Sequence, residues 1–165
     1  MALSSGQKLL RFDRKLGARL VAGTDEAGRG SLAGPLVVAG VLLDYGCLRD
    51  HKVRPLGLLN DSKQVAPERR ETLFGPTAPE HRAVVDGDEK SAAIAAASIV
   101  AKVTRDRLMR RMDALYPHYG FSSHVGYITP GHSAIVRERG PSRIHRRSFQ
   151  ALCYLSAEEL AAMSA

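Results

Sequence analysis

Two adjacent acids, Asp25 and Glu26, stand between an apolar stretch and a glycine-rich bend formed by Gly28, Arg29 and Gly30. Carboxylates at the end of a strand can bind a hard divalent cation such as Mg²⁺, which prefers oxygen ligands. The glycines allow the chain to bend and leave backbone N–H groups open to a phosphate or a sugar. Because successive strand residues point to opposite faces, the two carboxylates share a site only if the strand breaks there. An ordinary tight turn with surface acids explains the segment equally well.

Two further segments place charged groups just before a predicted helix. Asp61, Ser62 and Lys63 combine a hydroxyl, an ammonium group and a helix N-terminus, which together suit a phosphate. Helix capping by the Asp or the Ser explains them as well. Asp86 and Asp88 precede a long helical segment and face the same side if a strand extends that far. The alternative is that Asp88 caps the helix.

Aromatic and basic residues gather toward the C-terminal end of the chain. Tyr127 follows a glycine in a basic region, where an aromatic ring can stack on a base or a sugar. His145, Arg146 and Arg147 form a run that can hold phosphates. Packing of Tyr127 inside the protein is the alternative. The six histidines follow no metal-ligand spacing.

The charge balance favours a polyanionic partner. The 165 residues include 24 Lys and Arg against 17 Asp and Glu, a formal net charge of +7, and a basic surface attracts nucleic acid. A solvated basic face is the plain alternative. No apolar run is long enough to span a bilayer, and the N-terminal residues do not resemble a secretory signal. With two cysteines and no disulfide framework, we expect a cytoplasmic protein without membrane contact.

Hydrophobic patterning predicts the α/β elements that must position these groups. Residues 20–25 and 36–43 are predicted to form neighbouring buried strands. A long helix is predicted over 90–115, where Pro117 ends it. Its apolar stripe comprises Ile94, Ala97, Ala101, Leu108, Met112 and Leu115, and Lys102, Arg105 and Arg110 are expected off that stripe. The other predicted elements are helices at 65–74 and 130–139, a short strand at 83–85 and a last helix opened by a capping box at 156–159.

The length of the chain supports one ordinary domain. Residues 1–19 are basic and amphipathic, and we expect them to form a peripheral helix or arm. Residues 20–150 are predicted to form the main α/β domain, and 151–165 to hold the short C-terminal helix. We expect the protein to be a monomer.

Five segments in one order closely resemble bacterial ribonuclease HII: TDEAGRGSLAGPLVVAGVLL, LNDSK, GDEKSAAIAAASIVAKVTRDRLM, YGFSSHVGYIT and GPSRIHRRSF. The resemblance covers most of residues 20–149. It implies an RNase H-like fold, with a mixed central sheet flanked by helices. It also implies an endonuclease that hydrolyses the RNA strand of RNA–DNA hybrids and cuts at ribonucleotides embedded in duplex DNA. The implied cofactor is Mn²⁺ or Mg²⁺.

The resemblance implies a role for each matching residue. Asp25 and Glu26 match the family's first two metal-binding carboxylates and Asp88 matches the last, so these three are the expected catalytic residues. The glycine-arginine-glycine turn at 28–30 matches the one that reads the 2′-hydroxyl beside the scissile phosphate. Tyr127 matches the tyrosine that packs on the sugar after the ribonucleotide and so senses an RNA-to-DNA junction. The other expected substrate-binding residues are Ser62 and Lys63, which match phosphate-contacting positions, and His145, Arg146 and Arg147.

One interval of the family is missing from this chain. The family has a strand, a long helix and another strand between the LNDSK helix and the Gly-Asp segment, and the second strand ends in an Asp-Gly that supplies a further metal-binding carboxylate. Here only GPTAPEH lies between Phe74 and Arg82. We therefore expect one or two sheet strands and a helix fewer than in the family, an exposed sheet edge and weaker metal binding. Asp86 is a candidate substitute for the missing carboxylate.

Three functions remain open from the sequence. The first is a metal-dependent endoribonuclease of the ribonuclease HII type. The second is a catalytically impaired protein that binds RNA–DNA hybrids or junctions through the same turn and Tyr127. The third is a nucleotide- or phosphate-binding protein that uses DEAGRG as its loop. The first function predicts that Asp25→Asn abolishes cleavage and leaves binding intact.

Overall fold

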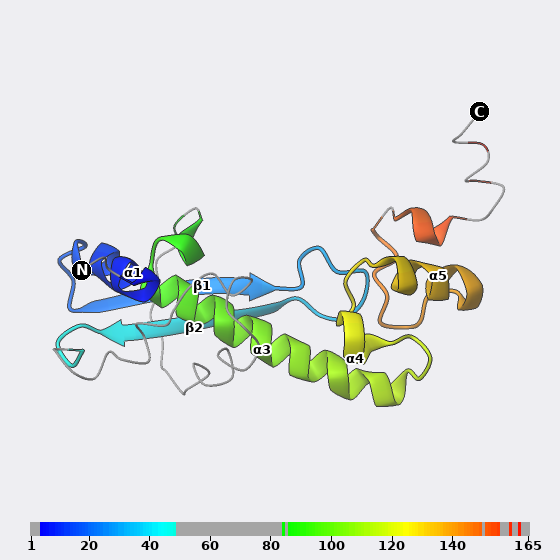
Figure 1. The fold of residues 1–165 in the computed structure, drawn as a ribbon, viewed down its shortest axis with the longest axis horizontal. Coiled ribbons are helices and arrows are strands. Elements are labelled where there is room, and N and C mark those ends of the chain that lie inside the picture. Colours follow the sequence, from blue (N-terminus) through cyan, green and yellow to red (C-terminus); the bar gives the residue numbers. More distant parts are fainter. Residues whose placement is uncertain are drawn as a thin grey trace. The chain divides into compact units, whose positions relative to one another are not determined.

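A computed structural model describes residues 4–48, 84, 86–149, 151–155, 159 and 162. These residues belong to two compact units. Unit 1 comprises the residues up to Ala27 together with Val37–Thr104, and unit 2 comprises Gly28–Leu36 together with the residues from Arg105 onward. The elements in chain order are α1 (Ser5–Arg14), β1 (Leu20–Ala27), β2 (Val37–Asp44), the 3-10 helix η3 (Gly87–Glu89), α3 (Ala92–Leu115), α4 (Phe121–His124), α5 (Pro130–Arg139) and the 3-10 helix η4 (Leu152–Tyr154) (Figure 1).

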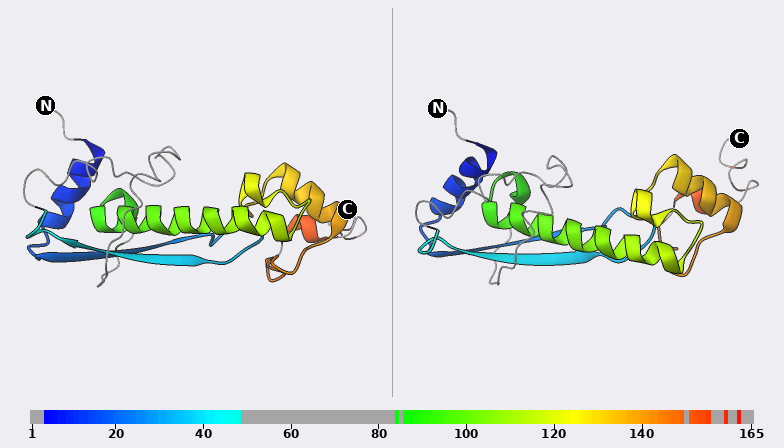
Figure 2. Two further views of the ribbon diagram at one scale, coloured as in Figure 1. Left: turned by 90° about the horizontal axis from the view of Figure 1, so that it is seen from below. Right: turned by 60° about the horizontal axis from the view of Figure 1, so that its bottom comes forward.

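Unit 1 is built on an antiparallel pair of strands. β1 and β2 pair so that Gly23 lies opposite Val41 and Asp25 lies opposite Ala39. The face of the pair that carries Val41 is buried, and the side chains alternate between this face and the other one. Both views of Figure 2 show α1 and the first half of α3 on the same side of the pair. The core of unit 1 contains Leu9, Leu10, Val21, Val41, Leu43, Ala92, Ala93, Ala95, Ala97, Ile99 and Val103.

The first turn of α3 is held by both β1 and α1. A Cβ atom at Gly23 would overlap the backbone of Ala93 and Ile94, so only glycine allows this approach of strand and helix. Asp13, buried at the end of α1, accepts hydrogen bonds from the Ala93 N–H and the Tyr45 hydroxyl, each at 3.0 Å. Burial raises the pKa of Asp13. These contacts fix the point at which α3 begins.

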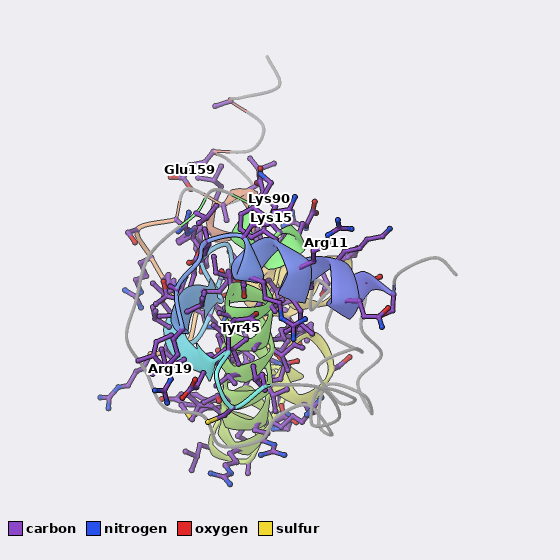
Figure 3. The ribbon with its side chains drawn as sticks, turned by 90° about the vertical axis from the view of Figure 1, so that its left-hand side faces the viewer. Arg11, Lys15, Arg19, Tyr45, Lys90 and Glu159 are labelled. Carbon is purple, nitrogen blue, oxygen red and sulfur yellow. The ribbon has the colours of Figure 1, made fainter. Side chains whose placement is uncertain are left out.

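The N-terminal end of unit 1 is basic and exposed. Arg11 in α1 and Lys15 just after it are exposed to solvent, and both lie at the end of the molecule seen in Figure 3. Arg19 pairs with Asp44 at 2.8 Å and joins the start of β1 to the end of β2. The hydrogen bonds from Arg19 hold the pKa of the Asp44 carboxyl well below its usual range. Of the helix or arm expected in residues 1–19, the structure shows the helix, α1.

Unit 2 is organised around the segment Gly28–Leu36, which follows β1. Backbone N–H groups of Ala33 and Gly34 donate to the carbonyls of Gly126 and Ile144 at 3.2 and 3.0 Å. Two apolar clusters pack around the segment. One contains Ala33, Met109, Phe121 and Val125, and the other contains Leu32, Val136 and Cys153.

The predicted elements agree with the structure wherever it describes them, apart from Val84 of the strand predicted at 83–85, which lies in no strand. The strands predicted at 20–25 and 36–43 are β1 and β2, and the helices predicted at 90–115 and 130–139 are α3 and α5. The helix predicted at 65–74 lies outside the described residues, as do all but one residue of each element predicted at 83–85 and 156–159. Among the described residues, no helix has the length and apolar character needed to cross a bilayer.

The predicted apolar stripe of α3 needs one correction. Arg105, expected off the stripe, has 0% of its surface exposed, whereas Leu108 and Leu115, expected on it, are 36% and 71% exposed. Arg105 follows Ala101 by one helical turn and precedes Met109 by another, so all three lie on the same face. Ala101 and Met109 are also fully buried. A charged side chain therefore occupies the middle of the buried face.

Candidate functional site

The acids Asp25 and Glu26 lie within β1 on opposite faces. β1 continues to Ala27 without a break, so the strand break that a shared site requires is not present. Asp25 lies on the same face as Gly23, which is the face that contacts α3. Glu26 lies opposite Val38, whose side chain is 65% exposed on the other face.

The acids before α3 have separate surroundings. Asp88 lies within η3. Asp86, just before it, adopts a left-handed conformation with φ 49° and pairs with Lys90 at 3.6 Å between exposed side chains. The Ser91 hydroxyl accepts a hydrogen bond from the Ile94 N–H at 3.3 Å. Ser91 rather than Asp88 therefore occupies the capping position of α3, which is the position that the sequence alternative gave to Asp88.

The expected metal ligands fit a divalent cation in chemical type. Asp25, Glu26 and Asp88 are carboxylates, and carboxylate oxygens suit Mg²⁺ and Mn²⁺. In the part of the chain that the structure describes, no group of three or more His, Cys, Asp or Glu side chains is placed to hold a metal ion. The donor chemistry thus agrees with the expected cofactor, while the described residues do not gather three donors.

The turn after β1 presents an exposed tip on a fixed base. Arg29 and Gly30 are exposed, and Gly28 is buried. Gly28 has φ +92°, and a Cβ atom there would overlap the Arg105 side chain, so glycine is required on both counts. The N–H and the hydroxyl of Ser31 donate to the Gly28 carbonyl at 3.3 and 2.9 Å. A ligand can reach the tip without any rearrangement of the base.

The Arg146 side chain holds the same turn by hydrogen bonds to the main-chain carbonyls of the turn. Its Nη1 donates to the carbonyls of Gly28 and Arg29 at 2.7 and 3.0 Å, and its Nε donates to the Gly34 carbonyl at 2.9 Å. Arg146 is expected to contact substrate, but these two nitrogen atoms donate their hydrogen bonds to the protein itself. Arg147, its neighbour in the expected substrate-binding run, is exposed.

Tyr127 is connected through its backbone to two buried histidines. His132 Nδ1 lies 2.9 Å from the Tyr127 carbonyl oxygen, and His132 Nε2 lies 3.0 Å from His145 Nε2. The Ser142 N–H donates to His145 Nδ1 at 3.0 Å, so this nitrogen carries no proton. The neutral tautomers follow: His145 Nε2–H donates to His132, and His132 Nδ1–H donates to Tyr127.

Burial keeps both of these histidines neutral. Burial lowers the pKa of His132, and it lowers the pKa of His145 to about 4. His145 is 6% exposed, so its surroundings are those of a core residue. The sequence placed His145 among the substrate-binding residues because it adjoins Arg146 and Arg147.

The buried Arg105 side chain contacts both the segment that follows the turn and the Tyr127 ring. Its Nη2 donates to the Ser31 hydroxyl at 2.8 Å, and its Cζ lies 4.9 Å from the centroid of the Tyr127 ring. This separation is within the range of a cation–π contact. Sequence reasoning missed Arg105 and His132 as parts of the site. The helical spacing of Arg105 from Ala101 was a signal for its burial, whereas nothing in the sequence indicated the partners of His132.

Ser62 and Lys63 lie outside the described residues. Of the other expected site residues, the structure brings together the turn at 28–30, Arg146 and Tyr127 within unit 2, and Arg105 joins them there. Asp25, Glu26 and Asp88 belong to unit 1.

Comparison with known proteins gives one consistent family. A family model described as Ribonuclease HII matches residues 22–85 and 76–152. Ribonuclease HII of Geobacillus kaustophilus is 37% identical over 199 aligned positions, which cover 87% of this chain and 74% of the relative. Ribonuclease HII of Rhizobium johnstonii is 40% identical over 193 positions, covering 84% of this chain and 81% of the relative.

Two solved structures share the fold. The ribonuclease H2 from Pyrococcus horikoshii superposes with a TM-score of 0.56 at 24% identity, covering 79% of this chain and 94% of that one. A chain of the PCNA:RNase HII complex from Archaeoglobus fulgidus gives 0.59 at 23% identity, covering 80% and 96%. The architecture is therefore RNase H-like, as the sequence resemblance implies.

The alignments show that relatives contain residues that this chain lacks. The alignment to the Geobacillus relative extends over 199 positions although the whole chain has 165 residues, so the relative contains residues with no counterpart here. The family model matches in two pieces that overlap over residues 76–85. This overlap includes most of the stretch between Phe74 and Arg82 where the sequence places the deletion.

Proposed function

Because the chain belongs to the ribonuclease HII family, a family of endoribonucleases, we propose that it hydrolyses the RNA strand of RNA–DNA hybrids and cuts at ribonucleotides embedded in duplex DNA. The observation that carries this proposal is the turn at 28–30, whose tip is exposed and whose backbone is held by Arg146. A backbone turn of this kind can recognise a group without a specific base sequence.

The turn is the proposed reader of the 2′-hydroxyl, the one group that separates RNA from DNA at a given nucleotide. Such a reader must sit at a fixed position, because a mobile donor or acceptor would adapt to either sugar. The hydrogen bonds from Ser31 and Arg146 to the Gly28 carbonyl give the turn this fixed position. Arg29 and Gly30 at the exposed tip would contact the sugar and the neighbouring phosphate.

Tyr127 is the proposed sensor of the sugar that follows the ribonucleotide. Its ring is partly buried, with Arg105 against it and its backbone carbonyl hydrogen-bonded to His132. Packing of the ring against a sugar or a base tolerates any sequence, since every nucleotide has a sugar and a base face. The arrangement favours a preference for an RNA-to-DNA junction. Phosphate-binding charge would come from three exposed arginines of unit 2, Arg111, Arg143 and Arg147.

Asp25, Glu26 and Asp88 are the proposed catalytic residues. For all three to hold Mg²⁺ or Mn²⁺ together, β1 would have to open at Glu26, because Asp25 and Glu26 lie on opposite faces of the strand. When bound, such an ion would supply an activated water and stabilise the charge on the leaving oxygen. Asp25 lies on the face of β1 that contacts α3, and Asp88 lies in η3 just before α3. Asp86, exposed and paired with Lys90, is the proposed substitute for the missing carboxylate.

A second function, binding of RNA–DNA junctions without cleavage, is favoured by a specific observation. The described residues gather no group of three metal-ligating side chains, and the chain lacks an interval that its relatives contain. The turn and Tyr127 lie outside the interval between Phe74 and Arg82, where the sequence places this loss. A protein with these features could recognise the junction and lack the chemistry.

The deciding experiment uses a labelled DNA duplex that contains one ribonucleotide, incubated with Mn²⁺ or Mg²⁺, beside an Asp25→Asn control. A cut on the 5′ side of the ribonucleotide that disappears in the control supports the nuclease. No cut, together with tighter binding of this duplex than of an all-DNA duplex, supports the junction-binding protein. Equal affinity for both duplexes without cleavage contradicts both functions. The expectations of a monomer and of a cytoplasmic location stay predictions.

A further inference from the structure

Arg105 is a fully buried charged side chain within unit 2. Removing a guanidinium from water is costly unless its donors find partners. Desolvation by burial lowers its pKa. A side chain that persists there must therefore be compensated by the groups around it, and these groups define what it holds together.

The guanidinium donates to the segment that follows the turn. Its Nη2 bonds to the Ser31 hydroxyl at 2.8 Å and to the Ala33 carbonyl at 3.0 Å, and its Nε bonds to the Pro35 carbonyl at 3.1 Å. The same side chain occupies the space beside Gly28 where a Cβ atom would lie. Arg105 thus contacts the base of the proposed 2′-hydroxyl reader at several points.

The same guanidinium also holds the proposed sugar sensor. Its Nη1 donates to the Val125 carbonyl at 2.8 Å, close in sequence to Tyr127. Its Cζ lies 4.9 Å from the centroid of the Tyr127 ring. One rigid planar group therefore spans two chain segments that are distant in sequence. A lysine ammonium has no planar fork and cannot reproduce this set of contacts.

We infer that Arg105 is a positioning residue that sets the separation between the turn at 28–30 and Tyr127, and thereby the preference for an RNA-to-DNA junction. This inference rests on the proposed function, because it takes the turn and Tyr127 as the two substrate readers. Arg105 is fully buried, so it acts through these readers and does not touch the substrate. Altering it should change discrimination between duplexes more than affinity for duplexes in general.

The test measures metal-free binding by fluorescence anisotropy, which needs no catalysis. Two labelled duplexes of the same sequence are compared, one with a single ribonucleotide and one all-DNA. The readout is the Kd for the all-DNA duplex divided by the Kd for the ribonucleotide duplex, so a larger ratio means stronger discrimination. Arg105→Lys is expected to reduce the ratio about tenfold, because it removes the planar fork that bonds to both segments. Arg110→Lys, an exposed arginine on the same helix, is the matched control and should keep the ratio.

A double-mutant cycle with Tyr127→Leu separates positioning from general support of the fold. If Arg105 acts through the tyrosine, Arg105→Lys lowers the ratio much less in the Tyr127→Leu background. A merely structural residue would lower the melting temperature and weaken binding of both duplexes equally, leaving the ratio unchanged. That result would overturn the inference.

Folding of the variant is checked by circular dichroism, and Ser31→Ala is used if Arg105→Lys does not fold. This change removes one partner of the guanidinium and should lower the ratio about threefold to fivefold; an unchanged ratio overturns the inference. The wild-type protein separates the two proposals. If the wild type discriminates between the two duplexes and the variant does not, the inference is supported. If both proteins discriminate equally well, the inference is contradicted and the proposed function is not. Equal wild-type affinity for both duplexes contradicts junction reading and the inference with it.

Discussion

Acid should destabilise the protein through the buried histidine pair behind Tyr127. His132 and His145 share a hydrogen bond of 3.0 Å, and His145 Nδ1 accepts a hydrogen bond from the Ser142 N–H. Both rings are needed in the neutral form, because a protonated His145 Nδ1 could no longer accept. His124 stacks on His132 with centroids 3.9 Å apart, so protonation also places positive charges together.

The sign and size of the effect follow from the pKa values. In the unfolded chain a histidine titrates near its ordinary pKa of about 6.5, whereas burial lowers the pKa of folded His145 to about 4. The unfolded state therefore binds more protons between these values, and stability falls as the pH falls. From about pH 7.5 to about pH 5, His145 alone should cost about 2 kcal/mol of unfolding free energy. His132, whose pKa is lowered in the same direction, adds to the loss.

Urea denaturation at the two pH values measures this loss, with His145→Gln as the comparison. A glutamine amide can still donate to His132 but does not titrate. The variant should be less stable at neutral pH and should lose about 2 kcal/mol less than the wild type on acidification. Asp13 and the other acids are common to both proteins, so they cancel in this difference. Equal losses in the wild type and the variant would refute the reasoning.

Three further predictions follow from the glycines and from the proposed metal chemistry. Gly126→Ala should lower the unfolding free energy by about 2–4 kcal/mol in urea denaturation, because φ is +84° and the added Cβ would overlap the Ala33 carbonyl oxygen. Gly23→Ala should cost about 1–3 kcal/mol by overlap with the α3 backbone. Gly131→Ala in α5, where a Cβ meets nothing within 4 Å, is the control for both and should cost nothing measurable. EDTA should abolish cleavage of the single-ribonucleotide duplex and leave its binding intact, and added Mg²⁺ should restore cleavage; cleavage that survives EDTA contradicts the metal-assisted mechanism.

The elements that could be predicted from the sequence are those with a strong local pattern. The apolar run at 36–43 and the helical spacing at 90–115 both appear in the structure as β2 and α3. The prediction that Arg105 lies off the apolar stripe is wrong, although its spacing of one helical turn from Ala101 places both on one helix face. Its partners at 31–35 and at Val125 are remote in sequence, so no local pattern reveals them.

The candidate site was predictable in its residue types and less so in its geometry. The adjacency of Asp25 and Glu26 raised the question of a strand break, and only the structure shows β1 continuing through both. His145 and Arg146 were grouped with Arg147 by sequence, yet their contacts are with the protein itself. A residue's chemical type indicates what it can bind, whereas its burial decides what it does bind.

The way in which Arg105 and Arg146 hold the turn has a consequence for how this region can vary. The two guanidinium groups bond to main-chain carbonyls of Gly28, Arg29, Ala33, Gly34 and Pro35. Carbonyl oxygens are supplied by every residue type, so these bonds place no demand on the side chains of the loop. At the exposed tip, Arg29 and Gly30, the sequence constraint is transferred to two arginines on distant parts of the chain, whereas Gly28 and Ser31 at the base remain constrained themselves. Mutation can therefore explore new side chains at the tip of the turn, and with them new substrate preferences, while its shape is inherited unchanged.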